Sequence, residues 1–227
     1  MPLFSNIDLI ALFWFLVAWL GYSAFIEMTP QGRRGLNALM HRYRSLWMAR
    51  MLAREARMMD GQVIAALQNG TAFFASTSLI AIGGSLTLFH STEEMLTVIA
   101  ALPFGEAVTP VQWELKVIGL MIIFIYAFFK FAWAYRLYNY VAIMVGAAPP
   151  ASERDEPEAK AYGEATATVI TEAGRHFNRG QRAFFFALGY LGWFLGPLPL
   201  IITTAAIVIV QWRRQFASES RRAIHGS

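Results

Sequence analysis

The stretch VIAALQNGTAFFASTSLIAIGGSLTLF, from Val63 to Phe89, decides the fold class of this chain. It carries no charged side chain, and at 1.5 Å per residue a helix of this length exceeds the roughly 30 Å hydrocarbon core of a bilayer. Within it lie an amide pair, Gln68 and Asn69, and a series of small residues. The stretch therefore predicts a transmembrane helix that holds polar groups inside the membrane.

The composition of the whole chain favours a membrane protein. Of its 227 residues, 56% are hydrophobic and 15% are charged, whereas a soluble domain carries about 25% charged residues. Because cysteine is absent, disulfides, thiolate metal sites and a cysteine nucleophile are excluded. The net charge of +4 comes from arginines next to apolar segments. This predicts a bilayer with anionic headgroups as the partner, and no nucleic-acid binding.

Four apolar segments are long enough to be membrane spans, and no Lys or Arg precedes the first, as a cleaved signal peptide would need. The last contains Gly196-Pro197-Leu198-Pro199, where proline removes a hydrogen-bond donor and breaks or kinks a helix. We predict an all-α fold over residues 1–227, a single integral membrane bundle of four transmembrane helices with the last kinked or broken at Gly196, Pro197 and Pro199. The spans cover residues 7–26, 63–89, 115–134 and 183–212.

The basic and acidic segments between the spans predict cytoplasmic amphipathic helices. Residues 27–62 hold seven arginines, and their apolar residues recur at the helical steps of three and four, which predicts a helix lying along the headgroups. Residues 146–182 begin acidic and predict a short amphipathic helix at 165–177. The apolar series of the first segment is Leu36, Met40, Tyr43, Trp47 and Met51.

The positive-inside rule orients the chain. The loop 27–62 is arginine-rich and the loop after the second span has no Lys or Arg, so we expect the first loop in the cytoplasm and the N-terminus outside. Four spans then place the basic tail, residues 213–227, outside, against the rule. A separate crossing by Ala183–Leu195 would bring the tail inside, but this segment is short for a span, so four spans are preferred.

Two stretches resemble the signatures of a known family. The run GQRAFFFALGYLGWFLGPLPLI, Gly180 to Ile201, is similar to the pattern G-x-R-A-F-Y-F followed by W-x-x-G-P-x-P in the "domain of unknown function 599" family, with Phe185 in place of the tyrosine. In the second signature, R-N precedes a small-residue run ending A-S-T; Asn69 and Ala75-Ser76-Thr77 match, and Gln68 replaces the arginine. The resemblance implies a four-span membrane protein found in bacteria and plants, and no activity. We therefore expect a multi-pass protein of the bacterial cytoplasmic (inner) membrane.

No catalytic or cofactor motif is present. The chain lacks the phosphate loop G-x-x-x-x-G-K-[ST], the dinucleotide pattern G-x-G-x-x-G, the zinc motif H-E-x-x-H and the nucleophile pattern G-x-S-x-G. His90 with Glu93 and Glu94 has only a loose metal-ligand spacing. We predict no enzymatic activity, no cofactor and no metal.

Polar side chains near the cytoplasmic ends of the spans form a candidate site. Such groups cost several kcal/mol in hydrocarbon unless they are satisfied, so they tend to face one another inside a bundle. In one interpretation they snorkel to the headgroups or hold helices together; in the other they line a polar vestibule that binds an anion, a lipid headgroup or a small solute. The predicted layer is Glu27, Gln68, Asn69, Lys130, Arg136 and Arg182.

Two further sets of residues share a helix face by their spacing. Arg50, Arg54 and Arg57 would form a ridge that contacts anions or lipid headgroups. The small residues Thr77, Ala81 and Ser85 would let a neighbouring helix approach closely, within the chain or between copies.

The sequence leaves three functional classes open. The first is small-solute, anion or lipid handling or permeation by a homo-oligomer, which the polar layer and the broken last span favour. The second is a structural, assembly or regulatory subunit of a larger membrane complex. The third is a lipid-modifying membrane enzyme, which only the predicted arginine ridge supports.

Overall fold

A computed structural model describes residues 3–32, 35–101, 108–219 and 223–224 of the chain. Within these ranges every regular element is a helix, which confirms the all-α class. In chain order they are α1 (Asn6–Met28), α2 (Leu36–Leu52), α3 (Met58–His90), α4 (Thr92–Ala100), α5 (Pro110–Gly146), η2 (Ala151–Glu153), α6 (Pro157–Tyr190), η3 (Leu191–Phe194) and α7 (Pro197–Phe216). Of these, α1, α3 and α5 are long and apolar enough to cross a membrane, so the chain is that of a membrane protein.

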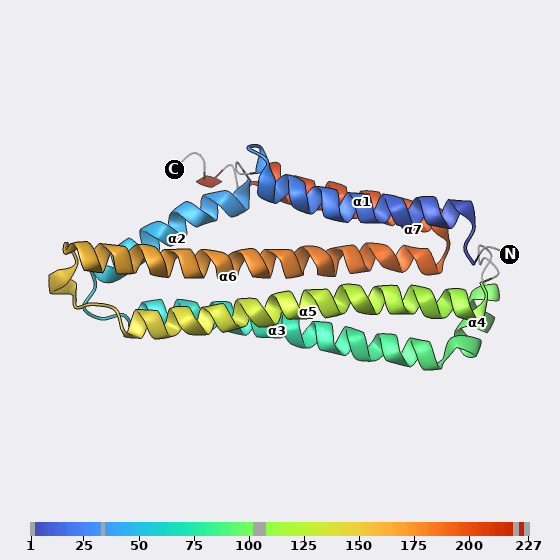
Figure 1. The fold of residues 1–227 in the computed structure, drawn as a ribbon, viewed down its shortest axis with the longest axis horizontal. Helices are drawn as coiled ribbons and strands as arrows, with labels where there is room; N and C mark the ends of the chain where they lie inside the picture. Colours follow the sequence, from blue (N-terminus) through green and yellow to red (C-terminus); the bar gives the residue numbers. More distant parts are fainter. Residues whose placement is uncertain (1–2, 33–34, 102–107, 220–222, 225–227) are drawn as a thin grey trace.

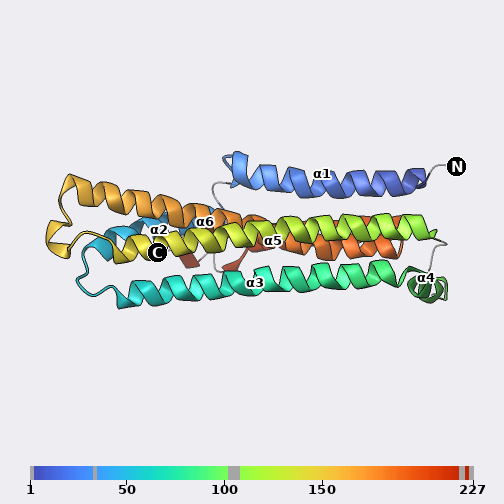
Figure 2. The ribbon, with the colours of Figure 1, turned by 60° about the horizontal axis from the view of Figure 1, so that its bottom comes forward.

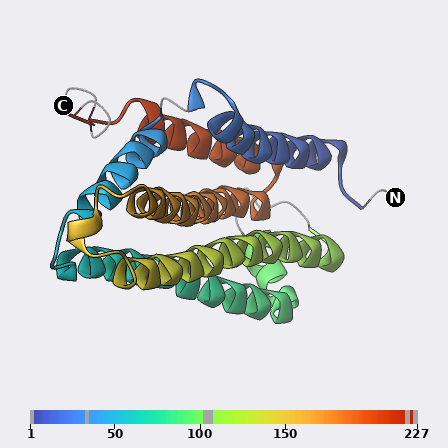
Figure 3. The ribbon, with the colours of Figure 1, turned by 60° about the vertical axis from the view of Figure 1, so that its left-hand side comes forward.

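The long helices lie along a common axis in three layers (Figure 1, Figure 3). The first layer is α3 with α5, the second is α6, and the third is α7 with α1. The slanted helix α2 covers the N-terminal half of α6, and α7 covers its C-terminal half. The short helix α4 lies at the end of the bundle where the N-terminus is found, opposite α2 (Figure 2).

Two buried clusters hold these layers together. One joins α1, α5 and α6 through the fully buried rings of Phe15, Phe131 and Phe186. The other packs Met48 and Met51 of α2 against α3, α5 and α6. Apolar side chains on the outer faces of α1, α3 and α7 remain exposed, as expected for surfaces that meet lipid.

A helix, α2, lies within residues 27–62 as predicted, but its buried apolar side chains have a partner that was not predicted. Met48, Met51 and Leu52 are buried against the rest of the protein, and α6 is the main neighbour of α2. Tyr43, assigned to the apolar face, is exposed. The prediction that this face lies along the headgroups is therefore wrong, because α6 already covers it.

The helix α6 is one continuous element where a short helix at 165–177 and a separate span from residue 183 were predicted. The helix continues without an end between these two segments. In this region Gly180 packs against the ring of Phe131, and a Cβ atom on Gly180 would lie only 2.8 Å from the ring carbon Cε1. The N-terminal half of α6 therefore extends the bundle beyond the end of α1, in contact with α2 and α5 (Figure 1).

The predicted break at Gly196 and Pro197 is present, but it reverses the chain. Gly196 has φ 132° and ψ 173°, which only glycine adopts readily, and Pro197 begins α7 as its first residue. On the two sides of the turn the helices lie against each other, and the Thr203 hydroxyl contacts the Gly189 carbonyl oxygen at 2.6 Å. One kinked span over 183–212 is therefore wrong, because its two halves run antiparallel (Figure 1).

Substituting Gly196 with alanine should lower the free energy of unfolding by about 1–3 kcal/mol, because a Cβ atom is strained at this backbone conformation. Detergent-induced unfolding in mixed micelles would measure the loss. Gly83→Ala is the matched control, since a Cβ atom there meets nothing within 4 Å and the residue lies inside a helix. Equal stability of the Gly196 variant and the parent protein would contradict the strained turn.

The small-residue row predicted on α3 is displaced by part of a turn. Ser85 is buried, but Thr77 and Ala81 are only half-buried. The buried small residues are Thr71, Ser78 and Ser85, seven residues apart, and α5 is the main neighbour of α3. This seam lets α3 and α5 pack closely within one chain.

Candidate functional site

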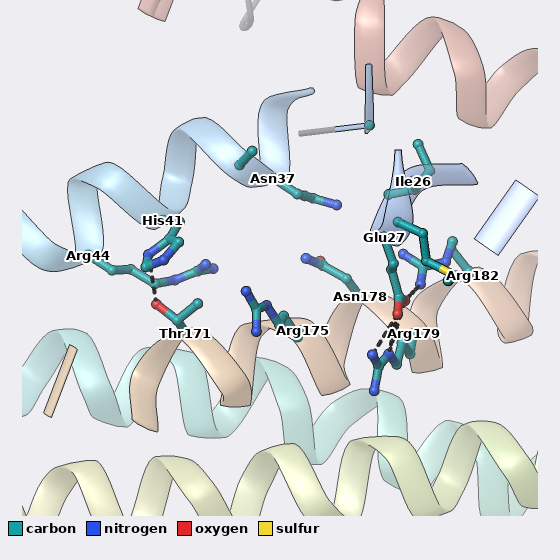
Figure 4. A pocket seen from close by; sticks show the side chains of 13 residues that line it. Ile26, Glu27, Asn37, His41, Arg44, Thr171, Arg175, Asn178, Arg179 and Arg182 are labelled. Atoms are coloured by element: carbon teal, nitrogen blue, oxygen red, sulfur yellow. Dashed lines mark hydrogen bonds and ion pairs between the residues drawn. The ribbon is translucent and has the colours of Figure 1, made fainter. Parts of the chain in front are cut away.

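A cationic cleft lies between α2 and α6, next to the C-terminal end of α1 (Figure 4). Its volume is about 790 Å³. It is lined by one carboxylate, four arginines and several neutral polar side chains, so its walls carry a net positive charge. The charged lining residues are Glu27, Arg44, Arg175, Arg179 and Arg182, and the polar ones are Asn37, His41, Thr171 and Asn178.

The end of the cleft nearest α1 is closed by a three-residue ion cluster. Glu27 accepts two hydrogen bonds from Arg179 Nε, at 2.9 and 3.1 Å, and another from Arg179 Nη2 at 2.5 Å. Arg182 Nη2 also donates to Glu27, and the Arg182 residue is only 7% exposed. The hydrogen bonds to Glu27 raise the pKa of Arg179. One carboxylate thus serves two guanidinium groups, and the cluster keeps one unbalanced positive charge.

The opposite end of the cleft presents an arginine without an acidic partner. The Arg44 guanidinium packs against α6 at Gly174. A Cβ atom added to Gly174 would lie only 2.6 Å from Arg44 Nη2. No acidic side chain in the described part of the chain forms an ion pair with it. Burial lowers the pKa of Arg44, and the nearby Arg175 contributes to the same effect. Both side chains point into the cleft from opposing helices (Figure 4).

The predicted polar layer is only partly assembled. Glu27 and Arg182 meet, as described above. Gln68 Nε2 donates to Asn139 Oδ1 at 2.5 Å, away from the cleft, while Asn69 is exposed on α3. Because successive helical residues differ in direction by about 100°, neighbours on α3 cannot share one interior site.

Two residues of the predicted layer, Lys130 and Arg136, lie on α5 and outside the cleft. Lys130 Nζ lies 5.0 Å from the ring centroid of Tyr126, and Tyr126 lines a smaller hollow of about 250 Å³ on the far side of Glu27. Arg136 is exposed, and its Nε donates to the Tyr140 hydroxyl at 2.6 Å. A single layer that contains all six predicted residues is therefore wrong.

The predicted ridge of Arg50, Arg54 and Arg57 is also wrong, because α2 ends at Leu52. Arg50 is exposed on the last turn. Arg54 Nη1 lies 2.5 Å from Oδ1 of the fully buried Asp60. Arg57 donates to the carbonyl oxygens of Ala148, at 2.7 Å, and Pro149. The last two arginines fasten loops and are not free for an anion.

Three of the four arginines that form the cleft, Arg44, Arg175 and Arg179, were missed, although the sequence carried a signal for two of them. Arg175, Arg179 and Arg182 have the same spacing, i, i+4 and i+7, as the rejected ridge, and here the helix is continuous. Recognising α6 as unbroken would have placed them on one face. Arg44 had no such signal, because its position depends on how α2 packs on α6.

A second polar cluster, also missed, lies at the other end of α1. Asp8 accepts from the Trp193 indole Nε1 at 2.8 Å, and Lys116 Nζ donates to the Trp193 carbonyl oxygen at 2.8 Å. Asp8 also completes the capping box of α1 with Ser5. This cluster fixes the start of α1 against α5 and against the turn between α6 and α7.

Comparison with known proteins identifies the family and leaves its activity open. The family described as "Protein of unknown function, DUF599" matches residues 10–220. No curated protein and no solved structure matches the chain. Since this match covers nearly the whole sequence, the chain belongs to the DUF599 family.

Proposed function

We propose that the protein crosses the membrane five times, with its N-terminus outside and its C-terminal tail in the cytoplasm. The hairpin of α6 and α7 supports this threading, because it lies beside α1. Trp193 meets Asp8 at one end of α1, and Arg182 meets Glu27 at the other. The C-terminal part of α6 therefore covers the same depth as α1, although few of its residues would face lipid.

Five crossings place the basic C-terminal tail in the cytoplasm, as the positive-inside rule requires, whereas four crossings would place it outside. The loop that contains α2, the start of α6 and the end of α7 all lie toward one end of the bundle (Figure 1). That end carries the arginines of the loop that contains α2 and of the end of α7, while α4 lies at the opposite end. The short crossing of α6 is tolerated because its residues, such as Phe186 and Tyr190, are buried among other helices.

In the same proposal, the cleft between α2 and α6 binds a phosphate-bearing anion from the cytoplasmic side. The single observation that carries this role is Arg44, a largely buried guanidinium that points into the cleft with no acidic partner in the described chain. Guanidinium groups bind phosphate oxygens in pairs, and a second donor, Arg175, faces Arg44. The phosphate could come from an anionic headgroup, because the cleft opens beside the inner end of α1, or from a soluble phosphate ester.

Substituting Arg44 with methionine should weaken phosphate-ester binding about tenfold or more, the value of one charge-assisted hydrogen bond. Calorimetric titration in micelles of neutral detergent would measure this for glycerol 3-phosphate and for short-chain phosphatidylglycerol. Tighter binding of the lipid would identify a headgroup site, and equal affinities would identify a soluble ligand. Arg50→Met is the matched control, since Arg50 is exposed on the same helix outside the cleft. Equal binding by the two variants would contradict the site.

The remaining roles stay predictions. Solute permeation calls for a closed homo-oligomer, which mass measurement in lipid would detect. Co-purification with one fixed heterologous protein would favour a structural, assembly or regulatory subunit. A changed headgroup pool in a deletion strain would favour lipid modification.

A further inference from the structure

A smaller hollow of about 150 Å³, which we call the inner hollow, lies behind Arg182 among α1, α2, α6 and α7. Two arginines, Arg182 and Arg214, line it together with five side-chain amides, and none of its lining residues is acidic. Glu27 faces the cleft and does not line the inner hollow. The hollow therefore offers many hydrogen-bond donors and an excess of positive charge.

Three buried nitrogen atoms of residues that line the inner hollow have no hydrogen-bond partner among the residues that the structure describes: Arg182 Nε, Gln211 Nε2 and Gln215 Nε2. Arg182 and Gln215 are only 7% and 8% exposed. Buried donors are nearly always satisfied in native proteins, and leaving one unsatisfied is costly. A cluster of three on one small space is better explained by a missing acceptor than by three independent defects.

The Glu27 cluster shows why the chain itself does not supply this acceptor. Glu27, the carboxylate that contacts Arg182, is already bound to Arg179 and to Nη2 of Arg182. The Nε atom of Arg182 has no partner in the described part of the chain, and Arg182 lines the inner hollow. Gln215 is held in place by the start of α2, where a Cβ atom on Gly35 would lie 2.3 Å from Gln215 Nε2. The donors therefore come from two helices, α6 and α7.

We propose that the inner hollow is a second anion site, which binds a small tetrahedral oxyanion such as phosphate between Arg182 on α6 and Gln211 and Gln215 on α7. The oxygen atoms of the anion would accept hydrogen bonds from the guanidinium and amide N–H groups, and its negative charge would balance the excess positive charge of the Glu27 cluster. A water takes about 30 Å³ of liquid volume, so the hollow has room for the ion with some water. Binding there would fasten the last turns of α7 to α6. This site stands on its own donors, and it does not depend on ligand binding in the cleft.

The test is thermal unfolding in neutral micelles with sodium phosphate, against sodium chloride at equal ionic strength. All variants carry Arg44→Met, so that any phosphate binding in the cleft is weakened and is the same in every variant. Saturating phosphate should raise the midpoint by roughly 5 to 10 °C at about 100 times the dissociation constant. Gln211→Met with Gln215→Met should abolish this rise and should raise the midpoint in chloride, since two unsatisfied donors are removed. Gln62→Met, at an exposed glutamine of α3, is the control and should keep the full rise.

Three outcomes would overturn the proposal. The first is an equal phosphate effect in the double methionine variant and in the control. The second is no phosphate effect in any variant, and the third is a lower midpoint in chloride for the double variant, which would show that water already satisfies the amides. If the double variant does not fold, the Gln215→Glu variant tests the site instead. Its carboxylate would take the place of the anion, so its unfolding midpoint should not change with phosphate. Since Gln211 and Gln215 line the inner hollow and not the cleft, the difference between the double variant and the control does not depend on the proposed function of the cleft.

Discussion

Replacing Glu27 with glutamine is expected to lower the free energy of unfolding by about 2 to 4 kcal/mol. Glu27 is the partner of both Arg179 and Arg182, and the Arg182 side chain is 8% exposed. Removing one member of a buried ion pair leaves an uncompensated charge away from water, which costs more than the pair itself contributes. The Glu27 side chain is 32% exposed, and this places the expected loss below the upper end of the range for fully buried pairs.

Detergent-induced unfolding in mixed micelles would measure this loss, with Glu172→Gln as the control. Glu172 pairs with Arg175 on the surface of α6, with both side chains at least 40% exposed, so its loss should cost less than about 1 kcal/mol. Arg182→Met added to the Glu27 variant should recover part of the stability, since no buried charge is then left alone. Equal losses in the Glu27 and Glu172 variants would show that the cluster is merely a surface feature.

A reporter that is active only in the cytoplasm should be fully active when fused after Ser227. Five crossings return the chain to the side of α2, whereas the four spans predicted from the sequence would leave the tail outside. The turn at Gly196 makes this difference, because it converts one kinked segment into two antiparallel helices.

Two further fusions complete the topology experiment. The same reporter should be inactive when fused before Met1, and inactive when inserted after Ala101, at the end of α4. An inactive reporter at the C-terminus, together with inactive reporters at both other positions, would restore four crossings and contradict the hairpin.

The sequence was sufficient for features that depend on local pattern. The length and apolar content of α1, α3 and α5, the presence of the helix α2 and the position of the break at Gly196 all follow from residues close together in the chain. In each of these cases, the residue pattern within one short stretch of sequence determines the local structure. The Glu27–Arg182 contact was also within reach, because both residues lie at the inner ends of apolar segments.

The sequence was insufficient where tertiary packing decides. Proline and glycine at 196–197 predict a break, but only the contact between Gly189 and Thr203 shows that the chain reverses there. Gln68 and Asn69 are adjacent in the sequence, yet α5 satisfies one and leaves the other exposed. Arg50, Arg54 and Arg57 have the same spacing as Arg175, Arg179 and Arg182. Only the second set lies on one continuous helix, because α2 ends at Leu52.

The most direct test of the anion-binding cleft is an anomalous difference map from crystals soaked in arsenate, a phosphate analogue with a strong anomalous signal. We predict a peak between α2 and α6, within hydrogen-bond distance of the guanidinium groups of Arg44 and Arg175, that is lost in the Arg44→Met variant. A map with arsenic only at exposed arginines such as Arg50, and none in the cleft, would contradict the account.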